Sequence, residues 1–491
     1  MVMFNSFYFS TGIILLILGV SNNVDFKPKS SASSEIVICK TDDLESLPAT
    51  SFTNNATNPM AVMVRKNVYS LTAAEIASIK TGIAAMKALP TTNKTSWAYQ
   101  AAIHGTTLTN NLPSWNSCQH RTQFFLSWHR MYLYFFERIL RAKSGNPNLT
   151  LPYWNYQTNA VLHPAYRNSA ASNTLYNSTR NASINSGGAL PASISTSINN
   201  ALNNIPFFDF NSDLEGPHGS VHVAIGGNMG SVNRAALDPV FWLHHTNIDR
   251  LWEAWLRKCG GRQNPTSGAW ATQNFTFFDE NGTAVTMSGS QIVKTATQLN
   301  YRYDFPFMLP CNFVIANLER WRWITFRPLR IEGITKIENN RAKISFARSN
   351  AATFDKMIRD NKMDKILVST TDISDKLFVE LEDIKVDKLP EGTVEIYLNL
   401  PANEVPTSKS KSFAGTLDLF TATAHEGHGE KHPIMINVTT AVNALKLKPS
   451  DLKKAELTVV VRGNSVKGSE IKTNGNVQIG AINFVIQKAQ K

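Results

Sequence analysis

The spacing of apolar residues changes along the chain, and in the first half it is the spacing of helices. Residues 72–89 open with the capping-box sequence Thr-x-x-Glu and then place Ile and Met residues one helical turn apart. Residues 122–143 are apolar on nearly all sides, which is typical of a helix buried among other helices. Another helix is predicted from Asp238, an N-cap followed by proline, to about Lys258. Residues 168–204 are rich in Asn, Ser and Ala and are predicted to be loop.

After about residue 340 the apolar residues recur at every second position, as they do in strands. In residues 394–400, Val, Ile and Leu alternate with Glu, Tyr and Asn. Similar short runs occur at 343–347, 365–369, 376–382, 412–420, 433–438, 456–462 and 477–487. Eight short strands with few helical signals predict a β-sandwich. The predicted fold class is therefore α+β in several domains, with a mainly α-helical part followed by an all-β part.

Composition supports the same division. All ten Trp lie between Trp97 and Trp323, and most of the 11 His lie between His104 and His245. The 491 residues are 43% hydrophobic and 18% charged, which excludes a disordered or collagen-like chain. The net charge of +12 is shared evenly between the two parts, without the clustered basic and aromatic residues of a nucleic-acid-binding protein. We therefore expect no nucleic-acid partner.

A short apolar run at residues 11–20 stands near the start of the chain. It is similar to the apolar region of a signal peptide, although no Lys or Arg precedes Lys27, and it is short for a membrane-spanning helix. Residues 1–30 are therefore predicted to be a signal peptide and leader. The protein is predicted to be secreted or otherwise extracytoplasmic, and a membrane anchor is the alternative.

Several histidines stand at spacings that allow their side chains to meet. His218 and His222 lie four residues apart, so on one helix their imidazoles share a face and can share a metal ion. The zinc-protease motif needs Glu directly after the first His, where this chain has Gly219, so that motif is excluded. His120 and His129 lie nine residues apart. They can reach a common point only if His120 stands on a loop before the helix that carries His129.

His104 and the pair His244-His245 complete the candidate set. His104 ends the segment WAYQAAIH, just before a Gly-Thr-Thr break. His245 shares a helix face with Phe241 and Asp249, and a carboxylate one turn from a His can hold its second ring nitrogen. The segments lack the Glu-rich motifs of di-iron proteins, and neutral imidazoles suit copper or zinc. Because buried imidazoles without a metal would be costly, the set predicts a metal centre.

Four segments that carry or flank these histidines resemble the copper-binding regions of the type 3 copper proteins, which include tyrosinases, catechol oxidases (polyphenol oxidases) and molluscan haemocyanins. The segments are CQHRTQFFLSWHR, LPYWNY, PHGSVHVAIGG and DPVFWLHHTNIDRLW, and the resemblance covers roughly residues 60–305. It implies a four-helix bundle that holds two copper ions with three histidines each. These are His104, His120 and His129 for one copper, and His218, His222 and His245 for the other. His244 is then the adjacent residue that does not bind copper.

The resemblance also implies the chemistry, in which O2 is reduced to water while an o-diphenol is oxidised to an o-quinone. Phe241 and neighbouring aromatic residues are expected to keep the site dry. Cys118 stands two residues before His120, where fungal tyrosinases and molluscan haemocyanins carry a thioether from Cys to the His ring; a buried free thiol is the alternative. At most one disulfide can form among the remaining cysteines, and we expect the pair Cys259–Cys311, which leaves Cys39 unpaired.

Residues that tune this chemistry depart from the pattern of enzymes that hydroxylate monophenols. The resemblance implies a water-holding Glu at Glu215 and an Asn directly after the first ligand of the second copper, where this chain has Gly219. The residue after the next ligand is Val223, which is not a base. Val232, thirteen residues before His245, stands at the gate position, where a small residue leaves the site open. We therefore expect a diphenol oxidase with weak or no monophenol hydroxylation, and a tyrosinase with real hydroxylase activity is the alternative.

The C-terminal part resembles the plant-type β-domain of latent polyphenol oxidases. This resemblance rests on the stretch from FAGTLDLF to VQIGAINFVIQ, and YRYD at 301–304 resembles the tyrosine motif that closes the catalytic domain. The expected domains are a leader at 1–30, a dicopper catalytic domain at 31–305, a linker at 306–345 and a jelly-roll-like β-sandwich lid at 346–491. The lid implies a zymogen that stays latent until the lid is cut off. A haemocyanin-like O2 carrier is the other alternative, against which the single copper domain and the export signal argue.

Overall fold

The computed structural model describes residues 62–109, 112–258, 260–305, 322–338, 340–346, 356, 376–423, 433–473 and 475–490. Three predictions therefore lie outside the described residues: the leader at 1–30, the strand at 365–369 and the Cys259–Cys311 disulfide. None of the described helices combines the length and the apolar character that crossing a membrane requires.

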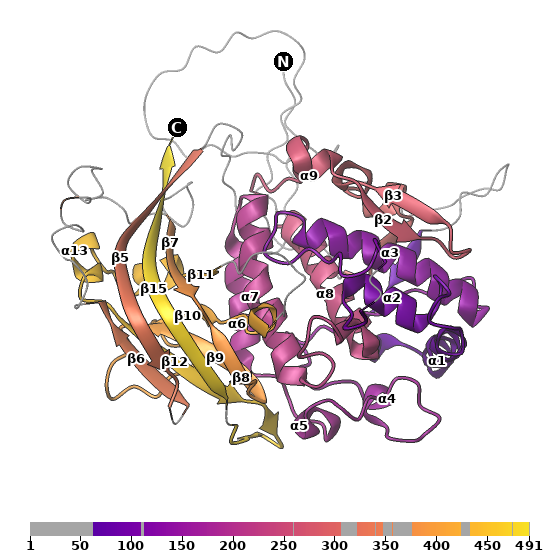
Figure 1. The fold of residues 1–491 in the computed structure, drawn as a ribbon, viewed down its shortest axis with the longest axis horizontal. Coiled ribbons are helices and arrows are strands. Elements are labelled where there is room, and N and C mark those ends of the chain that lie inside the picture. The colour runs from indigo at the N-terminus through magenta and orange to yellow at the C-terminus, as the bar shows by residue number, and fades with distance from the viewer. Residues whose placement is uncertain are drawn as a thin grey trace, which may run out of the picture. The chain divides into compact units, whose positions relative to one another are not determined.

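The part of the chain up to residue 305 is mainly helical (Figure 1). Its helices are α1 (Ala73–Lys87), α2 (Trp97–His104), α3 (Phe125–Ser144), α4 (Pro164–Arg167), α5 (Ala182–Asn185), α6 (Ala192–Asn203), α7 (Phe207–Ile225), α8 (Pro239–Leu256), α9 (Gly268–Thr272) and α10 (Thr295–Gln298). Short strands pair at its edges, β1 (Met63–Arg65) with β4 (Tyr301–Tyr303) and β2 (Phe275–Phe278) with β3 (Ala284–Met287).

Local signals place the ends of two predicted helices. At α1, the Thr72 hydroxyl accepts the N–H of Glu75, and the Glu75 carboxylate accepts the N–H of Thr72, so the predicted capping box is confirmed. At α8, the Asp238 carboxylate accepts the N–H of Val240, and Pro239 takes the first helical position, as predicted. The burial of most of α3 agrees with its apolar sequence.

Residues 168–204 are not simply a loop, and the prediction is wrong there. This stretch contains α5 and α6, and in α6 the residues Ile194, Ile198 and Ala201 are buried on one face that packs against α7. The composition of the segment does not reveal this apolar stripe. It averages the residues of the buried face with the polar residues of the other faces of the helix.

The C-terminal part is a sandwich of two sheets, which Figure 1 shows as long, curved strands. One sheet has the order β10-β9-β12-β6, with β6 (Arg341–Ser345), β9 (Gly392–Leu398), β10 (Phe413–Thr416) and β12 (Glu456–Gly463). The other has the order β11-β7-β15-β5, with β5 (Arg322–Lys336), β7 (Lys376–Glu382), β11 (Ile434–Asn437) and β15 (Asn476–Gln490), and β8 (Lys385–Lys388) also pairs with β15. The remaining short elements are α12 (Thr439–Ala444), α13 (Pro449–Leu452), β13 (Ser465–Val466) and β14 (Ser469–Glu470). All strand pairs within both sheets are antiparallel, and Phe346 meets Phe484 edge to face between them.

The sandwich begins earlier than predicted. β5 lies within residues 306–345, which the sequence predicts as a linker, and it pairs with β15 from Arg322–Gln490 to Lys336–Gln478. Its sequence, RWITFRPLRIEGITK, places Arg and Pro among the apolar residues and so obscures the alternation. The pairing partner lies far along the chain, which no local pattern reports.

The sandwich contacts the helical domain along α7. Lys376 of β7 forms an ion pair with Asp209, and Asn437 of β11 donates to Asp213 at 2.9 Å, both near the start of α7. Asn464 donates to the Ala224 carbonyl at 2.8 Å, near the end of the same helix. These contacts hold the sandwich beside the helix that carries His218 and His222.

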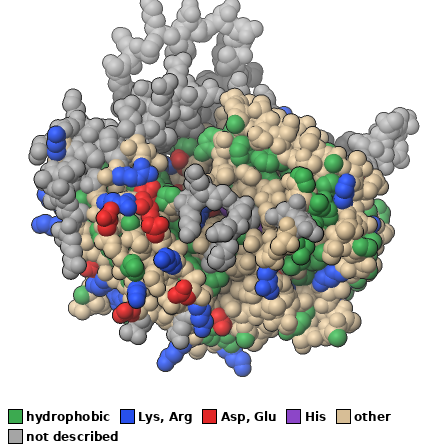
Figure 2. Space-filling view, viewed as in Figure 1, with side chains coloured by type: hydrophobic (Ala, Val, Ile, Leu, Met, Phe, Trp, Pro, Cys, Tyr) green, Lys and Arg blue, Asp and Glu red, His purple; other side chains and the backbone are tan. Residues whose placement is uncertain are grey.

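Figure 2 shows how charged side chains are distributed on one face of the molecule. On the face in Figure 2, Lys and Arg side chains are scattered among acidic and uncharged ones rather than gathered in one basic patch. Some are paired, such as Arg327 with Glu380 and Arg330 with Glu382 on the second sheet. Such pairs contribute little attraction for a distant polyanion.

Candidate metal centre

Four helices and one loop bring the predicted histidines into one cluster. His104 is the last residue of α2, His129 lies on α3, His218 and His222 lie on α7, and His244 and His245 lie on α8. His120 stands on the segment before α3, as the nine-residue spacing requires. All of these histidines except His120 are at most 2% exposed.

The imidazoles lie within metal-binding distance of one another. His218 and His222 have ring centroids 4.7 Å apart, and the Nε2 atoms of His222 and His245 are 3.2 Å apart. One group of ring nitrogens within 4.8 Å comprises His218, His222, His244 and His245. His104 belongs to two further groups, one with Cys118 and His120, the other with His129 and His245. His245 therefore stands between the two sets of histidines.

Backbone carbonyls orient three of these rings. In each case Nδ1 meets a carbonyl oxygen: His104 with Val232 at 3.0 Å, His129 with Phe125 at 2.8 Å and His222 with Met229 at 2.9 Å. Because a carbonyl only accepts, Nδ1 must carry the proton, and Nε2 keeps its lone pair. This is the arrangement that metal-binding histidines need.

Burial keeps the cluster uncharged and so suited to a metal. It lowers the pKa of His129 and of His222 to about 3, and burial together with neighbouring imidazoles holds the pKa of His218 and His245 well below the ordinary value. Neutral imidazole is the form that binds metal. Among the described residues, neither ring nitrogen of His218 and not Nε2 of His129 has a hydrogen-bond partner. Such orphaned, buried acceptors fit a pair of cations such as copper.

The predicted contact between Asp249 and His245 is not formed, so that prediction is wrong. The Asp249 carboxylate instead accepts from Arg65, Arg130, Tyr301 and Tyr303, and among the described residues Nδ1 of His245 has no hydrogen-bond partner. Burial alone would raise the pKa of Asp249, but the two Arg charges lower it on balance. Two guanidinium groups are stronger partners for a buried carboxylate than a neutral imidazole.

His244 and Cys118 flank the cluster. His244 lies in the same group as His218 and His222, and the Tyr156 hydroxyl is 3.4 Å from its Nδ1. The buried Cys118 places Sγ 3.5 Å from Nδ1 of His120, beside the ring to which the predicted thioether would attach. Burial raises the pKa of this thiol.

The tuning residues predicted from the sequence surround the cluster. The Phe241 ring lies 4.2 Å from the ring of His245, and the side chains of Val223 and Val232 are buried. Glu215 accepts the N–H of Arg121 at 2.7 Å, and its burial raises its pKa to about 8. Gly219 lies on α7 between His218 and His222.

One residue at the cluster comes from the sandwich and has no counterpart among the predictions. The Phe420 ring stacks on His222, with centroids 3.8 Å apart and planes at 9°, and it also lies 5.6 Å from His120. The sequence places this residue at the end of the apolar run 412–420, which predicts a strand. The strand β10 ends at Thr416, and the following turn carries Phe420 to the imidazoles.

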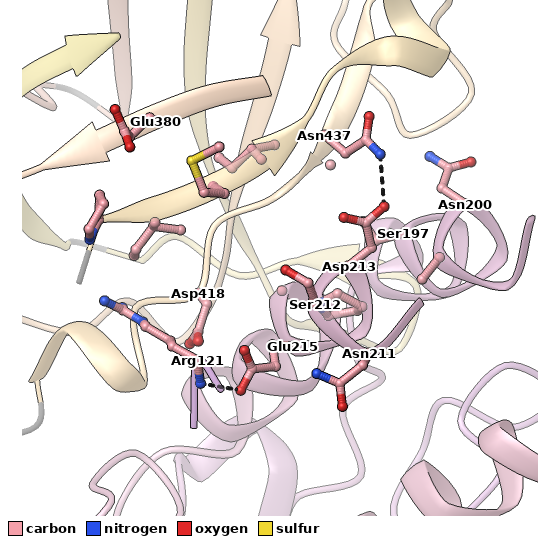
Figure 3. Close-up of a pocket in the computed structure, with 18 of the residues that line it drawn as sticks. Arg121, Ser197, Asn200, Asn211, Ser212, Asp213, Glu215, Glu380, Asp418 and Asn437 are labelled. Carbon is pink, nitrogen blue, oxygen red and sulfur yellow. Dashed lines mark hydrogen bonds between the residues drawn. The ribbon is translucent and has the colours of Figure 1, made fainter. Parts of the chain in front are cut away.

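A cavity of about 600 Å³ lies beside the cluster, between α6, α7 and strands of the sandwich. Figure 3 shows Arg121, Glu215 and Asp418 together at one end of it. Elsewhere in the cavity, the bond from Asn437 to Asp213 joins the sandwich to α7. The residues at the first end are close neighbours in sequence of His120, His218 and Phe420, so this end adjoins the histidine cluster.

Comparisons with known proteins match successive parts of the chain. Residues 94–207 and 167–258 match the common central domain of tyrosinase, and residues 265–328 match the polyphenol oxidase middle domain. Residues 335–487 match a domain of unknown function, DUF7868.

Two relatives illustrate the extent of the similarity. A tyrosinase of Hahella sp. (strain CCB-MM4) is 35% identical over 50% of this chain and 64% of its own length. Polyphenol oxidase II of Ipomoea batatas, a chloroplastic protein, is 26% identical over 85% of this chain and 77% of its own length. The chain thus spans less than two thirds of the length of the first of these relatives.

Solved structures share the fold. A latent aurone synthase (polyphenol oxidase) superposes with a TM-score of 0.60 at 20% identity, covering 91% of this chain and 93% of that one. Latent apple tyrosinase gives a TM-score of 0.58 at 19% identity, covering 89% of this chain and 99% of that one. The α+β fold in several domains is therefore confirmed. With the histidine cluster able to hold metal and the central and middle domains both matched, the chain belongs to the tyrosinase and polyphenol oxidase family of type 3 dicopper proteins.

Proposed function

We propose that the protein is a copper-dependent oxidase that converts o-diphenols (catechols) to o-quinones. The observation that carries the proposal is that neutral, buried imidazoles converge on one space, which we call the chamber. Their ring nitrogens lie within 4.8 Å of one another in overlapping groups. When bound, the two copper ions supply the binding and reduction of O2, so that two diphenols and one O2 give two quinones and two waters.

The proposed ligands fall into two sets of three. His104, His120 and His129 hold one copper, and His218, His222 and His245 hold the other. We assign His245 rather than His244 because Nε2 of His245 faces Nε2 of His222 at 3.2 Å, whereas the Tyr156 hydroxyl is in contact with Nδ1 of His244. Two imidazole nitrogens at that distance, in a group that is not protonated, are well placed for a cation.

The chain's own groups then prepare the site. The carbonyls of Val232, Phe125 and Met229 hold the Nδ1 protons and so fix the ring orientations. Phe241 covers His245 and excludes water. Glu215, with its pKa raised to about 8, is suited to hold a water molecule or to exchange a proton with a phenol at the edge of the chamber.

We propose diphenols rather than monophenols as the substrates because the residues that directly follow the two ligands on α7 have no polar side chain. Gly219 follows His218 and Val223 follows His222, so neither position can take the proton of a monophenol. Val232 at the gate is small and does not by itself exclude a phenol. A tyrosinase with hydroxylase activity and a haemocyanin-like O2 carrier are the outcomes that would contradict this proposal.

The sandwich is proposed to keep the enzyme latent as an intramolecular lid. Phe420 stacks on the His222 ring and is fully buried, so a phenol cannot occupy the same place while the lid is closed. Removal of the lid, by cleavage between residues 306 and 345, would free this face. We further propose export of the protein through the leader at 1–30, which determination of the N-terminus of the mature protein from its native cells would test.

The experiment measures O2 uptake by the copper-loaded full chain, with catechol and with tyrosine, before and after limited proteolysis between residues 306 and 345. We expect slow catechol oxidation before cleavage, fast oxidation after it, and little uptake with tyrosine. Fast tyrosine hydroxylation would contradict the assignment of Gly219 and Val223. Reversible O2 binding without catechol consumption, even after cleavage, would contradict the oxidase.

A further inference from the structure

The turn that carries Phe420 brings a second group to the chamber, a buried carboxylate. Asp418 is 3% exposed, and its Oδ1 accepts the N–H of Phe420 at 3.0 Å and the N–H of Thr421 at 3.3 Å. Its Oδ2 accepts the Thr421 hydroxyl at 2.7 Å. The turn therefore presents an aromatic ring and a carboxylate to the helical domain as one rigid unit.

The carboxylate fills a space that exists because residue 219 is glycine. A Cβ added at Gly219 would stand 1.8 Å from Oδ1 of Asp418 and 2.3 Å from its Cγ, far inside van der Waals contact. On the helical side, the two places are adjacent: the ring lies on His222 and the carboxylate lies on Gly219, less than one turn away along α7. When the lid is absent, the place over His222 is open to the ring of a substrate, and we call it the ring slot. The place over Gly219 is open to a group beside that ring, and we call it the bay.

A positive charge stands next to the bay. The Arg121 Nε donates to the Thr421 hydroxyl at 2.8 Å, and Figure 3 shows Arg121 beside Asp418. Burial raises the pKa of Asp418, and the Arg121 charge opposes that rise. The other carboxyl at this end, Glu215, has a pKa raised to about 8 and is largely uncharged near neutral pH. Arg121 is therefore the charged group that a carboxylate placed in the bay would face, while burial opposes its ionisation.

We propose that this turn mimics the substrate, and that the open site prefers o-diphenols that carry a carboxylate on a short side arm. This inference rests on the proposed oxidase function and names its substrate class. The amide of Phe420, to which the carboxylate is hydrogen-bonded, is separated from the ring by Cα and Cβ, so an arm of about two or three carbons spans the two places. A catechol without an arm fills the ring slot alone, and a cationic arm would meet Arg121.

The experiment compares 3-(3,4-dihydroxyphenyl)propanoate with its amide, which has the same size and no charge. Both are assayed with the copper-loaded full chain cleaved between residues 306 and 345, and with an intact chain that carries Asp418→Gly and Phe420→Gly together. We expect kcat/KM to be about tenfold higher for the acid, mainly through KM, as one charge-assisted contact implies. Within each variant the acid-to-amide ratio is the quantity measured, so changes in overall activity cancel.

Single-residue variants test which side chains produce the preference for the acid over the amide. Arg121→Gln should bring the ratio close to one, and Arg121→Lys should keep most of it. Gly219→Ala should also lower the ratio because the methyl group fills the bay. Gly216→Ala, on the same helix, is the matched control and should keep the ratio, since a Cβ there meets only a sandwich carbonyl, at 3.2 Å.

A binding measurement gives the same comparison without turnover. In the metal-free D418G/F420G chain, calorimetry should show tighter binding of 3-phenylpropanoate than of 3-phenylpropanamide, and Arg121→Gln should remove the difference. Equal values for acid and amide, with catechol still oxidised, would overturn this inference and leave the oxidase intact. Failure to oxidise catechol at all would overturn the oxidase and this inference with it.

Discussion

The two walls of the histidine cluster are built in different ways. On the helical side, the imidazoles come from α2, α3, α7, α8 and the segment before α3, and carbonyls of the same domain fix several of them. On the sandwich side, residues 418–421 form a single turn whose shape depends on one carboxylate. The first wall is part of a domain core and cannot move without unfolding, whereas a turn can withdraw with the loss of a few contacts.

The buried network behind α8 shows how firmly the helical wall is held. Asp249 joins Arg130 of α3 and Arg65 of β1, and both guanidinium groups are fully buried. Arg65 also lies 3.6 Å from the centre of the Tyr301 ring and pairs with Glu137. The network ties the first and last strands of the helical domain to the helix that carries His245. The lid turn meets the helical domain through other kinds of contact: Arg121 donates to the Thr421 hydroxyl, and the Phe420 ring stacks on His222.

The largest effect is expected from a variant that removes a proposed copper ligand on the helical side of the cluster. His222→Ala should remove one copper per chain and lower catechol oxidation by several orders of magnitude, because it removes a ligand and its oriented nitrogen. The measurement is copper content by elemental analysis together with O2 uptake. His163→Ala is the control: His163 caps α4 and contacts Tyr69, away from the cluster, so its copper content should be normal. Full copper content in His222→Ala would refute its assignment as a ligand.

The next effect is on stability. Asp249→Ala leaves Arg65 and Arg130 buried without their shared carboxylate and should cost about 3–5 kcal/mol of unfolding free energy. Denaturant titration of the metal-free chain measures it, with the exposed Asp387→Ala as control, for which about 0.5 kcal/mol or less is expected. A similar small cost for both variants would mean that the network does not hold the helical wall.

The shifted pKa of Asp249 also predicts how the stability of the chain depends on pH. The pKa of Asp249 is lower in the folded chain than the ordinary value of 3.8, so the folded state binds its proton less well than the unfolded state. Its stabilisation is therefore fully present above pH 3.8 and is lost as the pH falls through the folded value. The difference in stability between the wild type and Asp249→Ala should shrink on acidification. A difference that grows below pH 3.8 would contradict this sign.

A smaller effect is expected from a variant that opens the lid side of the cluster. Phe420→Ala removes the ring stacked on His222 and should raise catechol oxidation by the intact chain about tenfold, toward the rate of the cleaved chain, because the substrate's place is vacated. Copper content and unfolding midpoint should change little. Phe208→Ala is the control, since Phe208 lines the cavity between the domains without stacking on a histidine and is 46% exposed. Equal latency in Phe420→Ala and the wild type would show that another contact closes the site.

The smallest effect concerns the pH dependence of lid closure. Burial raises the pKa of Asp418 and raises that of Glu215 to about 8, so the closed state holds protons that an opened, solvated state would release. The closed state should therefore weaken as the pH rises from 4.5 toward 8. The ratio of cleaved to intact activity should fall a few-fold over this range. Asp418→Asn, which keeps one oxygen to accept the N–H groups of Phe420 and Thr421, should flatten the dependence. A ratio that rises with pH would contradict the sign.

Local sequence signals predict much of the helical wall because the information lies within a few residues. The Thr72 capping box and the Asp238-Pro239 start place α1 and α8, and the four-residue spacing places His218 and His222 on one face of α7. The position of His120 before α3 follows from geometry alone. The signal at α6 is weaker, because its apolar stripe is set in a stretch of polar residues.

The failures concern partners that lie far apart in the sequence. Asp249 stands where a carboxylate can reach His245, but Arg65, 184 residues away, and Arg130 attract it instead. β5 pairs with β15 across more than a hundred residues, and its own pattern is broken by Arg and Pro. Phe420 lies at the end of an apolar run, and nothing near it in the sequence indicates a histidine as its neighbour.

The sequence by itself determined which residues can bind metal, on which local elements they stand, and that a helical part precedes a sheet-rich one, since these follow from spacing and period. Only the tertiary structure decided that carbonyls rather than Asp249 orient the imidazoles, and that Phe420 and Asp418 occupy the chamber beside Gly219. The reason is physical: a hydrogen bond or a stacked ring depends on which surfaces packing brings together, and that choice is made by the whole chain.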